Sequence, residues 1–200
     1  MPKRAITTAR RRGRPPLASR EQLLDAAERA IRRHGPTVSL DRIADRAGVS
    51  KPVLFSHVGD RRELVRALSE RLLGRLEAAV RAAQARGREG RPALQRVIAA
   101  QLETIAEHRH LYAFVNGAGG GDTALEFARR AAAPLEDDIR LARTRAGQSG
   151  AVAASWSFAI IGMMYMVGSW WVAERPRALD ADSLARQLTE LLWSGVAPLG

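Results

Sequence analysis

The sequence contains no cysteine, and this absence removes several kinds of chemistry. The chain can form no disulfide framework, no thiolate nucleophile, no cysteine-ligated zinc site and no cysteine-held iron–sulfur cluster. Lysine is nearly absent too: only Lys3 and Lys51 occur, so arginine supplies most of the positive charge. The N-terminus begins Met-Pro-Lys-Arg and lacks the apolar run of a secretory signal. We therefore expect a cytoplasmic protein.

Histidines and carboxylates do not gather into a catalytic or metal-binding pattern. His108 and His110 are two residues apart, so a helix would point them about 200° away from each other and they could not chelate one metal. The carboxylate run 136–138 has no histidine nearby in sequence, and the glycines at 117–121 follow no strand that could begin a phosphate-binding loop. We predict that the chain is not an enzyme and uses no cofactor or metal.

The composition is that of a globular chain with an uneven charge distribution. Its 200 residues, 46% of them apolar, can bury roughly 70% of the unfolded surface in one or two domains. The net charge is +11; residues 1–62 hold 15 basic and 6 acidic side chains, whereas residues 63–200 hold 17 and 15. This asymmetry favours a polyanion-binding module joined to a part that does not bind polyanions. A solubilising basic tail is the alternative that composition leaves open.

Apolar residues recur at spacings of three and four, and no stretch alternates as a strand would, so we predict an all-α fold of about nine helices. Ser19 with Gln22, Ser39, Ser50, and Asp60 with Glu63 are expected helix starts. Gly48 should supply a left-handed turn, and Leu54 and Val58 should point into a core. The helix that begins at Asp60 should be long and end near 87–90, and further helices are expected from Pro92 and around 110–115. A flexible loop is expected at 116–121, followed by a helix from Asp122 or Thr123 to about Ala146 with a kink at Pro134. The next helix should span about 149–173, and the last should begin at a cap formed by Asp180 or Asp182.

The two short helices joined by residues 47–50 predict a helix-turn-helix, whose second helix, about 12 Å long, suits a DNA major groove. Residues 19–68 resemble the DNA-binding domain of the TetR (tetracycline repressor) family of bacterial transcriptional regulators. The family spacing is carried by Ala26, Gly35, Ile43-Ala44, Ala47-Gly48-Val49-Ser50, Leu54, His57 and Leu64.

The resemblance implies that residues 51–58 form the recognition helix, where Lys51, Pro52 and Val53 approach base edges. His57, Arg61 and Thr37 would contact phosphates. A lysine can donate to guanine O6 and N7, and a valine can pack on a thymine methyl group, so the chemistry agrees.

Phe55 departs from the family pattern, because the family usually has a tyrosine there whose hydroxyl donates to a phosphate. Upstream, residues 10–16 contain Arg-Gly-Arg-Pro, which is similar to the core of an AT-hook and could place Arg12 and Arg14 in a narrow minor groove. Diffuse attraction to phosphates is the alternative for this arm. The candidate DNA-binding residues are Arg12, Arg14, Thr37, Ser50, Lys51, Pro52, Val53, Phe55, His57 and Arg61.

We divide the chain into a basic disordered arm (1–18), a three-helix helix-turn-helix domain (19–64) and a helical regulatory and dimerisation domain (65–200). One recognition helix contacts too few bases for selectivity, so a homodimer on a palindromic operator is expected. Helices at about 149–173 and 180–193 are the interface candidates. The resemblance also implies a pocket for a small-molecule effector, and its candidate lining residues are Gln101, Tyr112, Phe114, Phe127, Trp156 and Met163, although such side chains are often ordinary core.

Residues 146–173 carry no formal charge and are long enough to span a bilayer. Serines and glycines dilute this run, however, and a soluble fold can bury it, so we expect no membrane contact. The predicted function is a ligand-responsive repressor; the alternative is a regulator that senses a partner protein or the membrane. The sequence does not decide the effector, the operator, or repressor versus activator.

Overall fold

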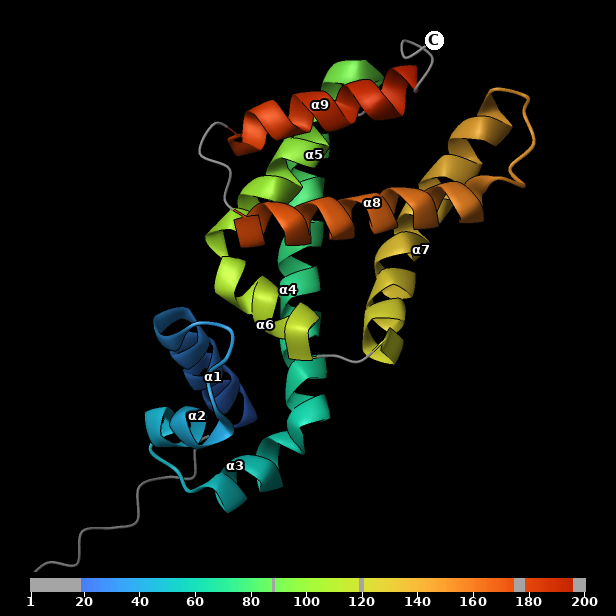
Figure 1. Cartoon of the computed structure of the whole chain (residues 1–200). Coiled ribbons are helices and arrows are strands. Elements are labelled where there is room, and N and C mark those ends of the chain that lie inside the picture. Colours follow the sequence, from blue (N-terminus) through green and yellow to red (C-terminus); the bar gives the residue numbers. More distant parts are fainter. Residues whose placement is uncertain (1–18, 88, 119–120, 175–178, 196–200) are drawn as a thin grey trace, which may run out of the picture.

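The computed structural model describes residues 19–87, 89–118, 121–174 and 179–195. Over these ranges the chain forms nine α-helices and no strand, which confirms the predicted all-α fold. The helices are α1 (Arg20–His34), α2 (Leu40–Ala47), α3 (Lys51–Val58), α4 (Arg61–Gln84), α5 (Gly90–Glu107), α6 (Arg109–Ala118), α7 (Gly121–Arg145), α8 (Ala153–Glu174) and α9 (Ala181–Ser194). Figure 1 shows α1–α3 gathered at one end of the long helix α4, and α8 and α9 in the other half of the molecule, where α9 lies across α5.

The α1–α3 end, which we call the head (residues 19–59), is built by local signals that act as predicted. Ser19 and Gln22 form a reciprocal capping box on α1. Ser39 Oγ accepts from the first turn of α2, and Asp60 Oδ1 accepts from the N–H of Glu63 at 2.9 Å at the start of α4. Ser50 is a partial exception, because its backbone is that of an N-cap but its side chain makes no cap hydrogen bond.

Two apolar cores hold the helices together. The first joins the head to α4 and α6 and includes Leu23, Ile43, Leu54, Leu68 and Phe114. The second joins α5, α8 and α9 through residues such as Leu102, Met164 and Leu188. The head is thus packed on the same core as the start of α4, which fixes its position relative to the rest of the chain.

Several predicted boundaries are wrong. Helix α4 ends at Gln84 and α5 begins at Gly90, before Pro92. The loop predicted at 116–121 is largely helical: α6 continues to Ala118 because Leu111, Tyr112, Phe114 and Val115 bury one face of it, and α7 begins at Gly121. Residues 119–120 lie outside the described residues.

The uncharged run also begins its helix later than predicted, at Ala153 rather than Ser149. The backbone carbonyl of Ser149 accepts from Arg143 Nε at 2.7 Å, and its hydroxyl accepts from the N–H of Ala151 at 3.2 Å, so both groups serve the turn between α7 and α8. Pro134 lies inside α7, which continues through it as a helix.

Candidate nucleic-acid interface

The turn between α2 and α3 sets the angle of the second helix. Gly48 has φ +68° and ψ +26°, the left-handed conformation predicted from the sequence. Its N–H donates to the carbonyl of Asp45 at 3.1 Å, and the N–H of Val49 donates to Ala44 at 3.1 Å. These bonds end α2 and lead the chain directly into α3, which is the arrangement of a helix-turn-helix.

Helix α3 is seated by Leu54 and Val58, both buried in the core of the head as predicted. Its other side chains remain accessible: Lys51, Pro52 and Ser56 are exposed, and Val53 and Phe55 are half-buried. The helix is therefore fixed by its buried side and keeps a mixed face accessible, with Lys51 and Ser56 beside Val53 and Phe55, which suits both hydrogen bonds and apolar contacts in a groove.

Lys51, the first residue of α3, is held by a carboxylate from α2. Its Nζ lies 3.1 Å from Asp41 Oδ1 and 3.3 Å from Oδ2. The two side chains are 44% and 66% exposed, so the pair lies at the surface beside the predicted base-reading residue. Sequence reasoning missed Asp41; the signal available was its place in the first turn of the preceding helix, close to the start of α3 in any helix-turn-helix.

His57 is oriented by its own helix. Its Nδ1 is 3.0 Å from the carbonyl oxygen of Val53 and 3.0 Å from Ser56 Oγ. These two contacts hold the imidazole ring against the last turn of α3 and fix the direction of Nε2.

The other predicted contacts are spread around this helix. Thr37 is exposed just before α2, and Arg61 lies at the start of α4 with its guanidinium carbon 5.4 Å from the ring centre of Phe114 on α6. This contact joins the candidate phosphate-binding residue to a core residue of α6. Arg12 and Arg14 lie outside the described residues.

A cluster of charges clamps α1 against α4. Arg71 donates to Asp25 at 2.7 Å and Glu28 at 3.1 Å and also bonds Glu21, while Arg75 donates to Glu28 at 2.6 Å. Burial alone would lower the pKa of Arg71, but the hydrogen bonds to the three carboxylates outweigh it and raise the pKa. The guanidinium is therefore a permanent cation that fixes the head to α4.

The candidate effector residues fall in different surroundings. Phe114 is fully buried in the first core, Met163 packs in the second, and Gln101 is half-buried on α5. Trp156 is 49% exposed, with the guanidinium carbon of Arg143 4.9 Å from its ring centre. Of three cavities in the described part of the chain, one is lined by Phe127 and the other two by none of the six.

Tyr112 stands out because polar groups surround it inside an apolar core. It is 3% exposed, and its hydroxyl donates to the carbonyl of Tyr165 on α8 at 3.2 Å. Burial raises the pKa of Tyr112, and the neighbouring side chains of Ser169 and Asn116 lower it by less. Ser169 Oγ and Asn116 Nδ2 are themselves buried without a partner in hydrogen-bond geometry among the described residues. Buried polar atoms are nearly always paired, and the candidate partners of these two are the Tyr112 hydroxyl beside them, a water or a ligand.

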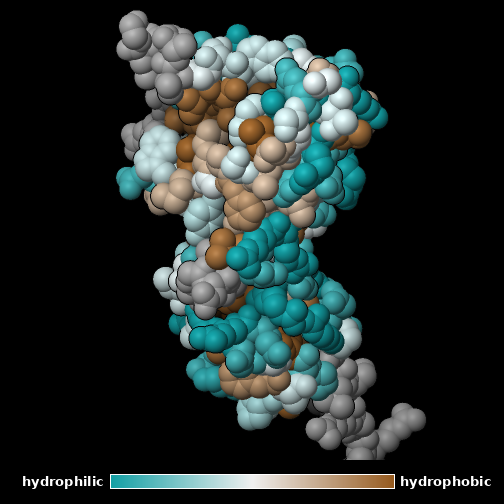
Figure 2. Space-filling view, turned by 90° about the vertical axis from the view of Figure 1, so that its right-hand side faces the viewer, coloured by the Kyte–Doolittle hydropathy of each residue, from teal (hydrophilic) through white to brown (hydrophobic). Residues whose placement is uncertain are grey.

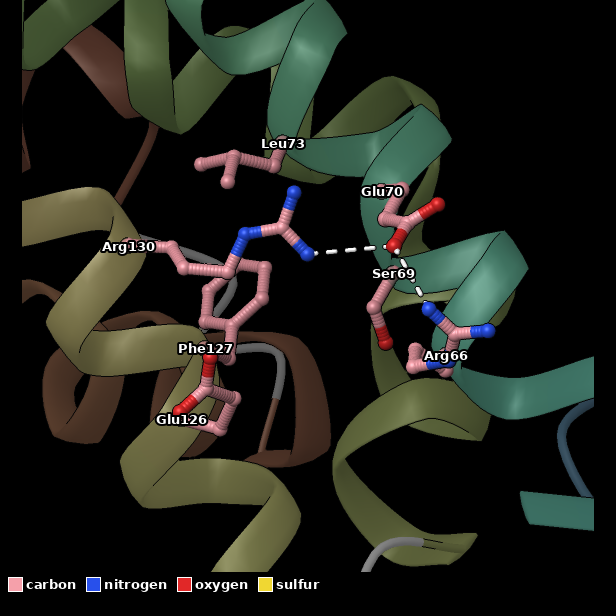
Figure 3. Close-up of a pocket in the computed structure, with 7 residues that line it drawn as sticks. All are labelled: Arg66, Ser69, Glu70, Leu73, Glu126, Phe127 and Arg130. Carbon is pink, nitrogen blue, oxygen red and sulfur yellow. Dashed lines mark hydrogen bonds and ion pairs between the residues drawn. The ribbon is translucent and has the colours of Figure 1, made fainter. Parts of the chain in front are cut away.

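Phe127 lines a slot between α4 and α7 that also contains Ser69 and Leu73 (Figure 3). Glu70 closes one side by accepting from Arg130 of α7 at 3.1 Å and from Arg66 at 3.4 Å. The free volume of this slot is about 30 Å³, which holds one or two water molecules. A larger occupant would require α7 to move away from α4.

Large apolar side chains are exposed on the two C-terminal helices. Figure 2 shows apolar residues gathered in the half of the molecule that contains α8 and α9, above a mostly hydrophilic half. The exposed residues on these helices are Trp156, Phe158, Met166, Trp170, Leu191 and Trp193. Among the described residues, α8 alone is long and apolar enough to cross a membrane, but a core helix of a soluble protein satisfies the same criterion.

Comparisons with known proteins agree with the geometry. Residues 23–68 match the family model described as "Bacterial regulatory proteins, tetR family", and residues 79–199 match "Tetracyclin repressor-like, C-terminal domain". An uncharacterised HTH-type transcriptional regulator of Mycobacterium tuberculosis is 30% identical over 88% of this chain and 76% of its own length.

Two solved structures have the same fold. A TetR-like transcriptional regulator from Rhodococcus sp. RHA1 has a TM-score of 0.63 and 25% identity over 92% of this chain and 99% of its own. The fatty acid degradation regulator FadR from Bacillus halodurans has a TM-score of 0.68 and 18% identity over 90% and 96%.

Proposed function

The chain belongs to the TetR family of bacterial transcriptional regulators, and from this premise we propose that it is a ligand-responsive repressor that binds a palindromic operator as a homodimer. Members of the family bind DNA, form dimers and are generally soluble, cytoplasmic and not enzymes. The observation that carries the proposal is α3: Leu54 and Val58 fix its apolar side while Lys51, Pro52 and Val53 stay accessible.

Selection from random DNA tests this function. The full-length protein should enrich a palindrome whose half-sites lie about one helical turn, or a multiple of it, apart. Lys51→Glu combined with His57→Ala should abolish enrichment, whereas Arg81→Glu, a charge reversal on an exposed residue of α4, should leave it intact. Recovery of DNA without sequence preference would contradict the proposal.

The exposed apolar face of α8 and α9 supports a homodimer. Six large apolar side chains on these helices are exposed, and a second copy packed on α8 and α9 would bury part of them. Trp170→Glu should shift the protein from dimer to monomer in sedimentation at micromolar concentration. Leu141→Glu, an equally exposed apolar position on α7, is the matched control and should remain dimeric.

The buried polar group around Tyr112 supports an effector site between α6 and α8. An effector with one hydrogen-bonding end would satisfy Ser169 and Asn116 while its apolar part lies among core side chains. Fatty acids are the first class to test, because one structural neighbour is a fatty acid degradation regulator. Binding should raise the melting temperature and release operator DNA, and Asn116→Leu should weaken both effects. No response to any fatty acid would remove this class.

A regulator that senses the membrane is the second candidate, favoured by the length and apolar character of α8. Extraction of the full-length protein without detergent distinguishes this candidate from the ligand-responsive repressor. The repressor should enter the soluble fraction, whereas a membrane-bound regulator should stay with the membranes.

A further inference from the structure

We propose that Asp41 is a positioning residue for base recognition, which holds the Lys51 ammonium ready for a base edge and lowers the affinity for DNA of unrelated sequence. This inference rests on the DNA-binding mode proposed above. The contact that carries it joins the first turns of the two helices of the helix-turn-helix, with Lys51 Nζ 3.1 Å from Asp41 Oδ1.

Two features of Lys51 explain why its ammonium needs the contact with Asp41 to stay directed toward a base. Lys51 is the first residue of α3, where the helix dipole is positive and disfavours a cation. It is also the only lysine among the described residues, on a flexible stem that lets the ammonium reach a phosphate as easily as a base. Asp41, in the first turn of α2, supplies the negative charge that restrains it.

The donor count of the ammonium leaves room for a base. An ammonium has three hydrogens, and the carboxylate of Asp41, at 3.1 and 3.3 Å, needs only one of them. Two hydrogens remain for the O6 and N7 acceptors that guanine presents in the major groove. Base contact and the Asp41 contact are therefore compatible with each other.

A phosphate contact is different, because it brings the Asp41 carboxylate toward the DNA backbone. Like charges repel, so a binding mode in which Lys51 only follows phosphates is penalised by Asp41. An exposed ion pair contributes little to the stability of the fold. The effect of Asp41 is therefore on whether the Lys51 ammonium contacts a base edge or a phosphate of the DNA backbone.

Asp41→Asn tests the inference, with Asp45→Asn as matched control. Asp45 is exposed one turn later on α2 and lines a groove with His34, Arg42 and Arg46 that Lys51 does not line. Both substitutions replace an aspartate by an asparagine, so they change the net charge equally. Affinities are measured at several salt concentrations for the operator selected by the wild type, for each single base-pair variant of it, and for random duplex DNA. Thermal melting confirms that both variants fold.

Asp41→Asn should bind random DNA about five-fold more tightly than Asp45→Asn, with a salt dependence steeper by about one phosphate contact. Discrimination at the base pair read by Lys51 should fall about five- to tenfold, and other positions should be unaffected. In a Lys51→Ala background, Asp41→Asn should have no further effect on discrimination.

Equal changes in the two asparagine variants would overturn the inference, because only net charge would then matter. Unchanged discrimination at every base pair in Asp41→Asn would also overturn it. In both cases the wild type would still select an operator, so the proposed function would stand. A wild type that selects no sequence would instead contradict the proposed function and this inference with it.

Discussion

Replacing Gly48 by alanine tests whether the turn of the helix-turn-helix depends on backbone conformation. An alanine Cβ at this position would meet no heavy atom within 4 Å, so steric crowding contributes nothing. The backbone has φ +68°, however, and a non-glycine residue in the left-handed region costs roughly 1–2 kcal/mol. For a chain of this size, 1 kcal/mol corresponds to a decrease in melting temperature of about 2–4 °C.

Gly74→Ala is the matched control. Gly74 lies inside α4, and its added Cβ would likewise meet nothing within 4 Å, but no positive φ is found there. Alanine should therefore stabilise the helix by roughly 0.5–1 kcal/mol. Both variants are melted at one protein concentration, since association shifts the melting temperature. If Gly48→Ala proved as stable as the wild type, or if both variants changed in the same direction, the assigned turn conformation would be wrong.

Phe55→Tyr should tighten operator binding about two- to tenfold at fixed salt without altering base preference, because the new hydroxyl can donate to a phosphate; unchanged or weaker affinity would refute this. Arg71→Gln should lower the free energy of unfolding by roughly 1–3 kcal/mol in a denaturant titration, whereas Arg66→Gln, at an exposed pair, should change it by less than about 0.5 kcal/mol. Burial lowers the pKa of His108, and the positive charges of Arg75 and Arg32 lower it further. The carboxylates of Glu107 and Glu28 raise this pKa, but by less. The His108 ring is therefore protonated at a higher pH in the unfolded chain than in the folded one. The free energy of unfolding consequently falls as the pH drops from about 6.5 to the lower pKa of His108 in the folded state. His108→Gln should flatten that part of a melting-temperature profile, and an equally steep profile would exclude His108 as the cause.

Local signals could be predicted from the sequence because they act over three or four residues. The capping box of Ser19, the Asp60 cap and the left-handed Gly48 each need only neighbours along the chain, and the structure has all three. The loop predicted at 116–121 failed for the opposite reason. Its glycines favour a turn locally, but burial of one face of α6 continues the helix to Ala118.

Contacts between distant segments could not be predicted. Arg71 meets carboxylates 43 to 50 residues earlier in the chain, and Tyr112 meets the carbonyl of a residue 53 positions later. No periodicity encodes such pairs, because each depends on how two helices pack. For the same reason the sequence identified Lys51 as a base-reading candidate but not Asp41 as its partner.

The strength of these contacts differs between the two sides of α4, and this difference determines which part can move. On one side the Arg71 and Arg75 clamp and a shared apolar core hold the head. On the other, near the slot, α7 is tied to α4 by the partly exposed ion pair of Glu70 and Arg130. Separating α7 from α4 therefore costs less free energy than separating the head from α4, because a partly exposed pair loses little when water replaces it. Widening of the slot should therefore displace α7, while α4 and the head stay together as one unit.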